Sequence, residues 1–348
     1  MTVKHDITFH PSWWYKNADI HFTQDFFDEP EYRMECDVKM RKALYEHFGE
    51  YGIGEKNPEK RPLIGSDLLA AGYLYSEIMG CEIKYQENNS PQVVCMELDE
   101  DTIDEVEDVD LDTNKVWAKT QKQIDYLVDK YGHVETHINL MGIQNIAMDL
   151  MGQELMVSYY TAPDEVKDLL TKITDLSIDI GKRFKALSPV VSAGVTAITK
   201  QTVPECYLTS NCSVEMISNE LYEKFLLEHD KRLAETFKNF GIHHCGQSME
   251  HVVDGYSKIP ELTFAEVGAG SDMKAVRAAL PNVYLNARYS PARSMNASEN
   301  EVFTEVEKLI KDGDNAKHEI SISCVGIDSN VSDENIINFL KACANVNL

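Results

Sequence analysis

The sequence predicts an α/β protein built as a closed (β/α)8 TIM-type barrel with an N-terminal extension. From about residue 113 onward, helical stretches alternate with short apolar strands, and the connections between them are brief. This rhythm is typical of parallel βαβ units. The chain has 348 residues, which accommodates the roughly 250 residues of such a barrel together with extra N-terminal segments. An open doubly wound sheet is the alternative.

Residues 1–112 are expected to supply the N-terminal extension and the first barrel segments. The first 60 of these residues are rich in aromatic side chains, and the strand, hairpin and helix patterns follow in order. In chain order, we expect a helix at 31–48, a loop at 56–62, a strand and a helix within 63–80, a hairpin at 81–98 and a solvated acidic stretch at 97–112.

Residues 113–348 are expected to form the remainder of the barrel, as part of one domain overall. Gly132 and Gly241 end two of the expected helices, and Pro163 lies in the first turn of another. The expected helices are 114–131, 162–187, 219–240, 248–259, 271–280, 299–313 and 334–346, and the expected strands are 133–142, 242–246, 262–268, 282–289 and 319–327.

Composition and charge exclude several classes of function. The formal net charge is −25, which argues against binding to nucleic acid or to anionic membrane surfaces, because both need a surplus of Lys and Arg. No run approaches the roughly 20 apolar residues of a membrane span. The N-terminus shows no secretory signal pattern, and the eight cysteines form no regular framework, so we expect a cytoplasmic protein with reduced thiols. GxGxxG, Walker, GxSxG and CxxC motifs are absent from the sequence.

The strongest local motif is His243-His244-Cys245-Gly246, at the end of an expected strand. Side chains alternate along a strand, so His243 and Cys245 share one face and His244 takes the other. Cys324 ends a second strand, and the carboxyl ends of barrel strands meet at one mouth. One histidine and two cysteines with an open fourth position are typical of catalytic zinc. The competing interpretation is that these cysteines are small buried hydrophobes.

From about residue 115 to the end, the chain resembles the uroporphyrinogen decarboxylase superfamily. The matching stretches include MDLMGQELMVSYYTAPDEVKDLL, ISNELYEKFLLEHDKRLAETFKNFGIHHCG, DMKAVRAALPNVYLNARYSP and ISCVGIDSNVSDENIINFLKA. The His-x-Cys-Gly motif, together with Cys324, is similar to the zinc motif of the corrinoid methyltransferase branch. The resemblance therefore implies that His243, Cys245 and Cys324 hold zinc. The decarboxylases of this superfamily use no metal and carry N-terminal arginines, whereas this chain has HPSWWYKNADIHF.

The resemblance implies a zinc-dependent methyltransferase that moves a methyl group from a small donor to the cobalt of a corrinoid protein. A methoxylated aromatic is one such donor, and the enzyme would then be an O-demethylase component. The alternatives are a methylcobamide:thiol methyltransferase and a metal-free uroporphyrinogen decarboxylase-like enzyme. The sequence contains no Asp-x-His-x-x-Gly cobalamin motif, so we expect the corrinoid (cobalamin) to arrive on a partner protein.

Four further residues are predicted to be catalytic from their positions at expected strand ends. Glu266 either ligates the metal or hydrogen-bonds a metal ligand or the substrate. Asn139, Gln144 and Asn211 lie where the family places polar active-site residues, although each could equally be a turn former or a helix cap. Cys212, which follows Asn211, is interpreted as an inert thiol.

Five residues are predicted to contact the substrate. Trp13, Trp14 and Tyr15 could line a pocket for an aromatic methyl ether, or could instead pack the extension over one end of the barrel. Asn286 and Arg288 end another expected strand. Arg288 could bind an anionic group of the substrate, or pair with a surface acid.

Overall fold

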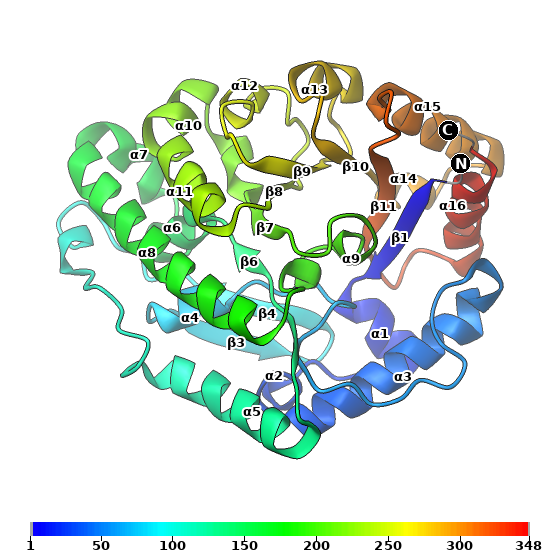
Figure 1. The fold of residues 1–348 in the computed structure, drawn as a ribbon, viewed down its shortest axis with the longest axis horizontal. Coiled ribbons are helices and arrows are strands. Elements are labelled where there is room, and N and C mark those ends of the chain that lie inside the picture. The colour runs from blue at the N-terminus through cyan, green and yellow to red at the C-terminus, as the bar shows by residue number, and fades with distance from the viewer. Residues whose placement is uncertain (1–2, 347–348) are drawn as a thin grey trace.

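The computed structural model describes residues 3–346, and their strands curl around a common centre with helices outside them (Figure 1). A seven-stranded sheet runs in the order β1-β11-β10-β9-β8-β7-β6, and β2 pairs with β5. All of these pairings are parallel. Only two residues separate β5 from β6, so the two form one interrupted barrel strand. The predicted (β/α)8 barrel is therefore confirmed.

The barrel strands are short, and most of their side chains are buried. Their bounds are β1 (Lys4–Phe9), β2 (Leu63–Gly65), β5 (Glu135–His137), β6 (Leu140–Met141), β7 (Tyr207–Ser210), β8 (Phe240–His244), β9 (Leu262–Val267), β10 (Tyr284–Tyr289) and β11 (Ile320–Ile327). The predicted hairpin is also present, as antiparallel β3 (Glu82–Gln86) and β4 (Asn89–Val94).

The helices form an outer ring around the strands (Figure 1). Their bounds are α1 (Pro11–Ala18), α2 (Gln24–Asp28), α3 (Pro30–Phe48), α4 (Leu74–Ile78), α5 (Lys115–Tyr131), α6 (Ile143–Met151), α7 (Glu154–Thr161), α8 (Pro163–Leu187), α9 (Thr199–Thr202), α10 (Asn219–Phe225), α11 (Leu227–Phe237), α12 (Val253–Tyr256), α13 (Met273–Ala279), α14 (Pro291–Ser294), α15 (Glu299–Gly313) and α16 (Asp333–Asn345). Short 3-10 turns are η1 (Gly49–Tyr51), η2 (Ile103–Glu105), η3 (Ser192–Gly194) and η4 (Cys212–Met216). None of the helices in this described part of the chain is long and apolar enough to cross a bilayer.

Several local features differ from the sequence-based expectation. The helix expected at 248–259 is reduced to α12, and β7, α6 and α7 were not expected. The segment 4–9 is a barrel strand, which no pattern in the aromatic-rich first 60 residues predicted. It is held by parallel pairing with β11, which brings the two ends of the chain together (Figure 1). The helix expected at 219–240 is divided into α10 and α11 at Leu226. The strand at 4–9 depends on pairing with a distant part of the chain, which local periodicity does not report.

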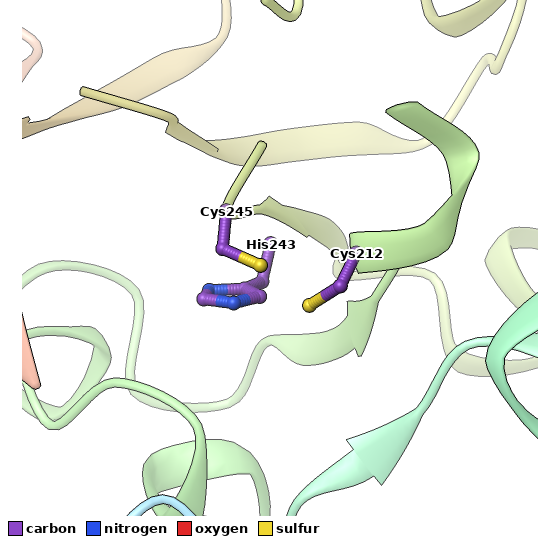
Figure 2. Close-up of side chains that lie close together, drawn as sticks. All are labelled: Cys212, His243 and Cys245. Carbon is purple, nitrogen blue, oxygen red and sulfur yellow. The ribbon is translucent and has the colours of Figure 1, made fainter. Parts of the chain in front are cut away.

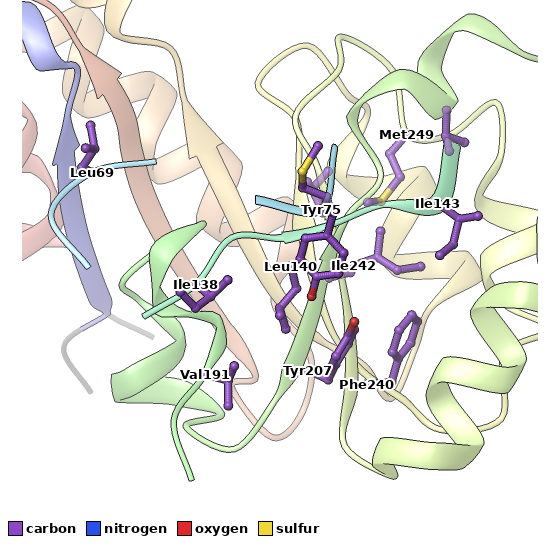
Figure 3. Packing of buried hydrophobic residues seen from close by; sticks show 14 of the residues in the cluster. Leu69, Tyr75, Ile138, Leu140, Ile143, Val191, Tyr207, Phe240, Ile242 and Met249 are labelled. Carbon is purple, nitrogen blue, oxygen red and sulfur yellow. The ribbon is translucent and has the colours of Figure 1, made fainter. Parts of the chain in front are cut away.

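Apolar side chains fill the space between the strands and the helix ring (Figure 3). Leu140, Tyr207, Phe240 and Ile242 come from neighbouring strands and are almost completely buried. The ring of Tyr207 stacks on that of Phe237 in α11, with centroids 4.1 Å apart. This packing fixes the strands rigidly, so side chains at their carboxyl ends are held in defined positions.

Candidate metal centre

Three potential metal ligands converge where β7 and β8 end. Cys212, His243 and Cys245 each offer one ligand atom, and these three atoms all lie within 4.8 Å of one another. Figure 2 shows the two sulfur atoms beside the imidazole ring. His243 belongs to β8, Cys245 follows that strand directly, and Cys212 begins η4, just beyond β7.

Strand alternation explains why these three side chains face the same way. Ser210 lies opposite His243 in the register of β7 and β8. The next residue, Asn211, donates its backbone N–H to the His243 carbonyl oxygen at 2.8 Å, which extends the pairing by one step. Cys212 is two residues beyond Ser210, and Cys245 is two residues beyond His243. Both cysteines therefore return to the face that carries the imidazole.

The chain leaves the metal centre through tightly packed glycines. A Cβ atom on Gly246 would lie 2.6 Å from a carboxylate oxygen of Glu215. The other oxygen of that carboxylate accepts the backbone N–H of Gln247 at 2.6 Å. A Cβ atom on Gly268 would lie 1.7 Å from the Gly246 carbonyl oxygen. Glycine is therefore required sterically at Gly268, where the clash is with the backbone, whereas a side chain at Gly246 would displace the Glu215 carboxylate from its hydrogen bond.

A fully buried carboxylate lies behind the imidazole. Glu266 is on β9, opposite His243 in the strand register, and its Oε2 accepts a hydrogen bond from His243 Nδ1 at 2.5 Å. The second oxygen, Oε1, lies 3.4 Å from Nε of Arg288, and neither residue is more than slightly exposed. Because Nδ1 is committed to Glu266, Nε2 of His243 remains available as a metal ligand.

The electrostatics of the cluster favour a thiolate beside a cationic imidazole. The hydrogen bond from the Cys212 thiol, helped by His243 and Arg288, lowers the pKa of Cys245 to about 3 even though burial opposes this. Burial alone would lower the pKa of His243, but Glu266 and Cys245 outweigh it and raise the pKa to about 9. The hydrogen bond that the Cys212 thiol makes to Cys245, together with burial, raises the pKa of Cys212 well above its usual value.

The donor set fits zinc. Two cysteine sulfurs and one imidazole nitrogen are ligands that zinc commonly takes, and three protein ligands leave a fourth position for substrate or water. The Glu266–His243 pair is the carboxylate–histidine arrangement that fixes ring orientation and raises the basicity of a zinc ligand. The Glu266 carboxylate is not one of the three groups that offer ligand atoms, so its contact with His243 is separate support for a metal site. We conclude that Cys212, His243 and Cys245 could hold zinc.

Cys324, the third ligand predicted from the sequence, is not a member of this group. It lies opposite Tyr289 in the register of β10 and β11, and the Tyr289 ring stacks on Phe339 of α16. The neighbouring Ser323 instead accepts a hydrogen bond from Asn286. Strand alternation therefore turns Cys324 towards the helix layer, where burial raises the pKa of its thiol to about 12.

Asn139 lies between β5 and β6, and Gln144 lies in the first turn of α6, just after β6. Asn139 accepts a hydrogen bond from Ser210 Oγ at 2.8 Å, which places it beside the strand that leads to Cys212. Gln144 is buried and donates to the Ser213 carbonyl at 2.7 Å. Both side chains support the backbone around the metal centre, and their direct contact with substrate stays a prediction.

Asn211 and Asn286 are also buried and hydrogen-bonded within the protein. Asn211 points away from the barrel centre and donates to Asp230 at 2.8 Å. Asn286 donates to Ser323 at 2.7 Å and accepts from Ser321 at 2.9 Å. Asn286 thus joins β10 to β11, while Arg288, two residues further along the same strand, reaches Glu266.

The aromatic residues of α1 lie in a separate part of the structure. Trp13 and Trp14 are almost completely buried, and both rings pack on Phe9 at the end of β1. Tyr15 is 38% exposed and its ring contacts His21. For the two tryptophans, the structure therefore corresponds to the packing alternative that the sequence left open, and it does not bring them to the metal centre.

Sequence reasoning missed Cys212, which it interpreted as an inert thiol. A signal was nevertheless present. Cys212 comes two residues after the last residue of β7, and Cys245 directly follows the last residue of β8. In both places a polar residue precedes a cysteine at a strand tip. The resemblance to the family motif pointed instead to Cys324, which the structure leaves outside this group.

The pKa of Cys245 leads to a prediction for the metal-free protein. We expect its alkylation by iodoacetamide, followed by peptide mass spectrometry, to be nearly independent of pH from about 5 to 8, because a thiol with a pKa of about 3 is already ionised there. An ordinary thiol would react about tenfold faster per pH unit over this range. Cys324 is the matched control and should remain unmodified, since it is buried and its pKa is raised to about 12. A steep rise with pH at Cys245 would contradict the ion pair.

The fold and the site together define a (β/α)8 barrel protein with a Cys-His-Cys group at the carboxyl ends of its strands. A model of the uroporphyrinogen decarboxylase (URO-D) family matches residues 67–346. The chain therefore belongs to the URO-D family.

Proteins that are similar to this chain in sequence or in fold carry different activities in their names. The methylcobamide:CoM methyltransferase MtbA of Methanosarcina mazei is 24% identical over 180 residues, which are 50% of this chain and 49% of that protein. The match thus spans about half the length of the curated relative. A methyltransferase from Methanosarcina mazei has a similar fold, with a TM-score of 0.66 and 16% identity over 98% of this chain and 93% of that one. A B12-independent methionine synthase from Shewanella sp. W3-18-1 aligns with a TM-score of 0.50 and 11% identity, over 99% and 96% of the two chains.

Proposed function

We propose that this protein is a zinc-dependent methyltransferase that transfers a methyl group between a small substrate and the cobalt of a corrinoid carried by a partner protein. The observation that carries this proposal is the convergence of Cys212, His243 and Cys245, with Glu266 behind the imidazole. The similarity to MtbA supports methyl transfer as the reaction. When bound, zinc would supply Lewis acidity towards a heteroatom of the substrate.

The chain's own residues would orient the substrate and hold charge at the barrel mouth. Glu266 fixes the ring plane of His243, and the buried strands keep both cysteines in place. Arg288 is mostly buried and faces the same mouth, and its Nε points at Glu266. One of its terminal nitrogens, Nη2, also donates to the Val325 carbonyl oxygen at 3.5 Å. The remaining N–H donors of the guanidinium would bind an anionic group of the substrate, which would position the heteroatom beside the two sulfurs.

The methyl donor is proposed to be a small ether or amine, such as a methoxylated aromatic, with the methyl group passing to cobalt. A cavity lies between the β2–β5 pair and helices α2 and α5, and Phe26, Phe27 and Tyr73 line it. Asn139 also lines this cavity. Its side chain accepts a hydrogen bond from Ser210, which lies next to the metal centre. An aromatic ring would be buried favourably among these side chains.

The second candidate is the transfer of a methyl group from a methylcobamide to a thiol. The match to MtbA favours it, because that protein is named as a methylcobamide:CoM methyltransferase. A Cys-His-Cys zinc site would also lower the pKa of a thiol substrate and present it as a thiolate. The two candidates use the same site and differ in the direction of transfer.

The test is a two-way methyl-transfer assay with the zinc-loaded full chain. In one direction, cob(I)alamin is mixed with a panel of methoxylated aromatics, methylamines and methanol, and methylcobalamin formation is followed by absorbance. In the other, methylcobalamin is mixed with a small anionic thiol such as mercaptoacetate. We expect turnover in one direction, and we expect Cys245→Ala to abolish it, because the metal loses a ligand.

Cys206→Ala is the matched control, since Cys206 is a buried cysteine outside the metal-ligand group, and it should retain activity. Wild-type rates in Cys245→Ala would defeat the proposal. So would release of carbon dioxide from a porphyrin acid by zinc-free protein, which would instead support the metal-free decarboxylase.

A further inference from the structure

The two metal-binding cysteines share a structural feature that the reaction does not use. Each is preceded by a buried polar residue that points away from the barrel centre, Asn211 before Cys212 and His244 before Cys245. Strand alternation requires this opposite orientation. Both polar side chains therefore enter the layer between the strands and helices α10, α11 and α12.

Asn211 is anchored by a buried carboxylate of α11. Its Nδ2 donates to Asp230 Oδ2 at 2.8 Å, and the hydroxyl of Tyr222 donates to the same oxygen at 2.7 Å. Asp230 is only 2% exposed, and burial raises the pKa of its carboxyl to about 6. A carboxylate in this setting depends on its two hydrogen-bond donors, so it restricts where Asn211 can lie.

His244 is anchored by α12 and by the loop that precedes this helix. Its Nε2 lies 3.2 Å from the Ser248 carbonyl oxygen, and its Nδ1 lies 3.1 Å from the hydroxyl of Tyr256. A carbonyl oxygen can only accept, so Nε2 carries the proton and the tyrosine hydroxyl donates to Nδ1. His244 is completely buried, and both of its ring nitrogens are engaged.

The two anchors meet in the helix layer. The rings of Tyr222 and Tyr256 are perpendicular to one another, with centroids 5.0 Å apart. Tyr222 belongs to α10 and Tyr256 to α12, so three helices contribute to one polar cluster. We call Asp230, Asn211, Tyr222, Tyr256 and His244 the anchoring network.

We propose that the anchoring network sets the separation of the Cys212 and Cys245 sulfurs, so that Asp230 and Tyr256 are positioning residues of the metal centre. The inference rests on the proposed function only in taking the cluster as a zinc site. Zinc–sulfur distances cluster near 2.3 Å, and a metal site tolerates deviations of only about 0.2 Å. Cys212 and Cys245 lie in two separate segments, just beyond β7 and β8. Side chains on the helix side of these segments must hold them in place if the two sulfurs are to meet that tolerance.

Cobalt(II) titration of the zinc-free full chain tests this inference. Cobalt(II) bound by two thiolates gives charge-transfer and ligand-field absorption bands whose position and intensity report the coordination geometry. We expect Asp230→Asn and Tyr256→Phe to remain folded, to bind cobalt(II) about 10-fold more weakly, and to show altered bands. Zinc affinity, measured by competition with a chromophoric chelator, should fall in parallel.

Tyr284→Phe is the control for the loss of a tyrosine hydroxyl that is hydrogen-bonded within the protein. Tyr284 begins β10, at the opposite end of the strands from the metal centre, and its hydroxyl donates to the Ile320 carbonyl at 3.2 Å. This variant should keep the wild-type cobalt spectrum and affinity. A purely structural role of the network would lower thermal stability in Asp230→Asn and Tyr256→Phe but leave the cobalt spectrum of each folded protein unchanged.

Wild-type cobalt affinity and spectra in both Asp230→Asn and Tyr256→Phe would overturn the inference. Asp230→Asn retains a carbonyl acceptor and Tyr256→Phe retains the ring, so either variant gives a result if the other fails to fold. The readout does not depend on methyl transfer. If the wild-type protein binds metal but transfers no methyl group, the proposed function fails and the anchoring network is still tested.

Discussion

Replacing Cys212 with alanine is expected to reduce bound zinc from about one ion per chain to a substoichiometric amount, whereas Cys324→Ala should retain it. Cys212 offers a sulfur within 4.8 Å of the other two ligand atoms, and Cys324 is outside that group. A site left with two protein ligands binds zinc far more weakly, because each ligand contributes directly to the binding free energy. Metal content is measured by elemental analysis after gel filtration.

Cys324→Ala also serves as the control for cysteine removal. The residue is buried and packs towards α16, so its loss should lower the free energy of unfolding modestly while the metal site stays intact. The opposite pattern, with zinc lost from Cys324→Ala and retained by Cys212→Ala, would show that the ligand set inferred from the sequence is the correct one.

Glu266→Gln is expected to weaken zinc binding by about 10-fold to 100-fold, a range typical of carboxylates that bond to metal-bound histidines. The neutral amide keeps the size of the side chain, but it removes the charge that holds His243 Nδ1 at 2.5 Å. The same loss should lower the pKa of His243 from its value of about 9, since the Glu266 charge is the largest of the influences that raise it. Calorimetric titration with zinc gives the affinity, and histidine NMR gives the pKa in the metal-free protein.

The chain contains a matched carboxylate–histidine pair for this experiment. Glu135 lies 3.3 Å from His137 Nε2, on β5 and outside the metal-ligand group. Glu135→Gln should therefore leave zinc affinity unchanged. Equal losses in the two glutamate variants would indicate a general effect on the barrel, and unchanged affinity in Glu266→Gln would exclude the proposed support of His243.

Much of this protein was predictable from its sequence because the relevant signals are local. Alternating helices and strands indicated the barrel, and the turn at NNSP indicated the β3–β4 hairpin. The two-residue spacing of His243 and Cys245 was enough to place both on one face of a strand. Glu266 was predicted at the mouth from its position at the end of a strand, and one of its predicted roles, a hydrogen bond to a metal ligand, matches its contact with His243.

The remaining features depended on contacts between distant segments. The β1 strand owes its place to pairing with β11, more than 300 residues away, and the short run KHDITF gives no strong strand signal by itself. The burial of Trp13 and Trp14 likewise follows from how the first helix packs on the end of that strand.

The sequence by itself determined the barrel and the mouth of the site through the alternation of helices and strands. It also determined the shared face of His243 and Cys245 at the end of β8 through the period of side chains along one strand. Only the tertiary structure decided which other cysteine joins that pair. The choice depends on which face of its own strand each cysteine occupies once the strands are registered against their neighbours. In β11, Ser323 faces Asn286 and so turns Cys324 outward, whereas pairing of Ser210 with His243 turns Cys212 inward.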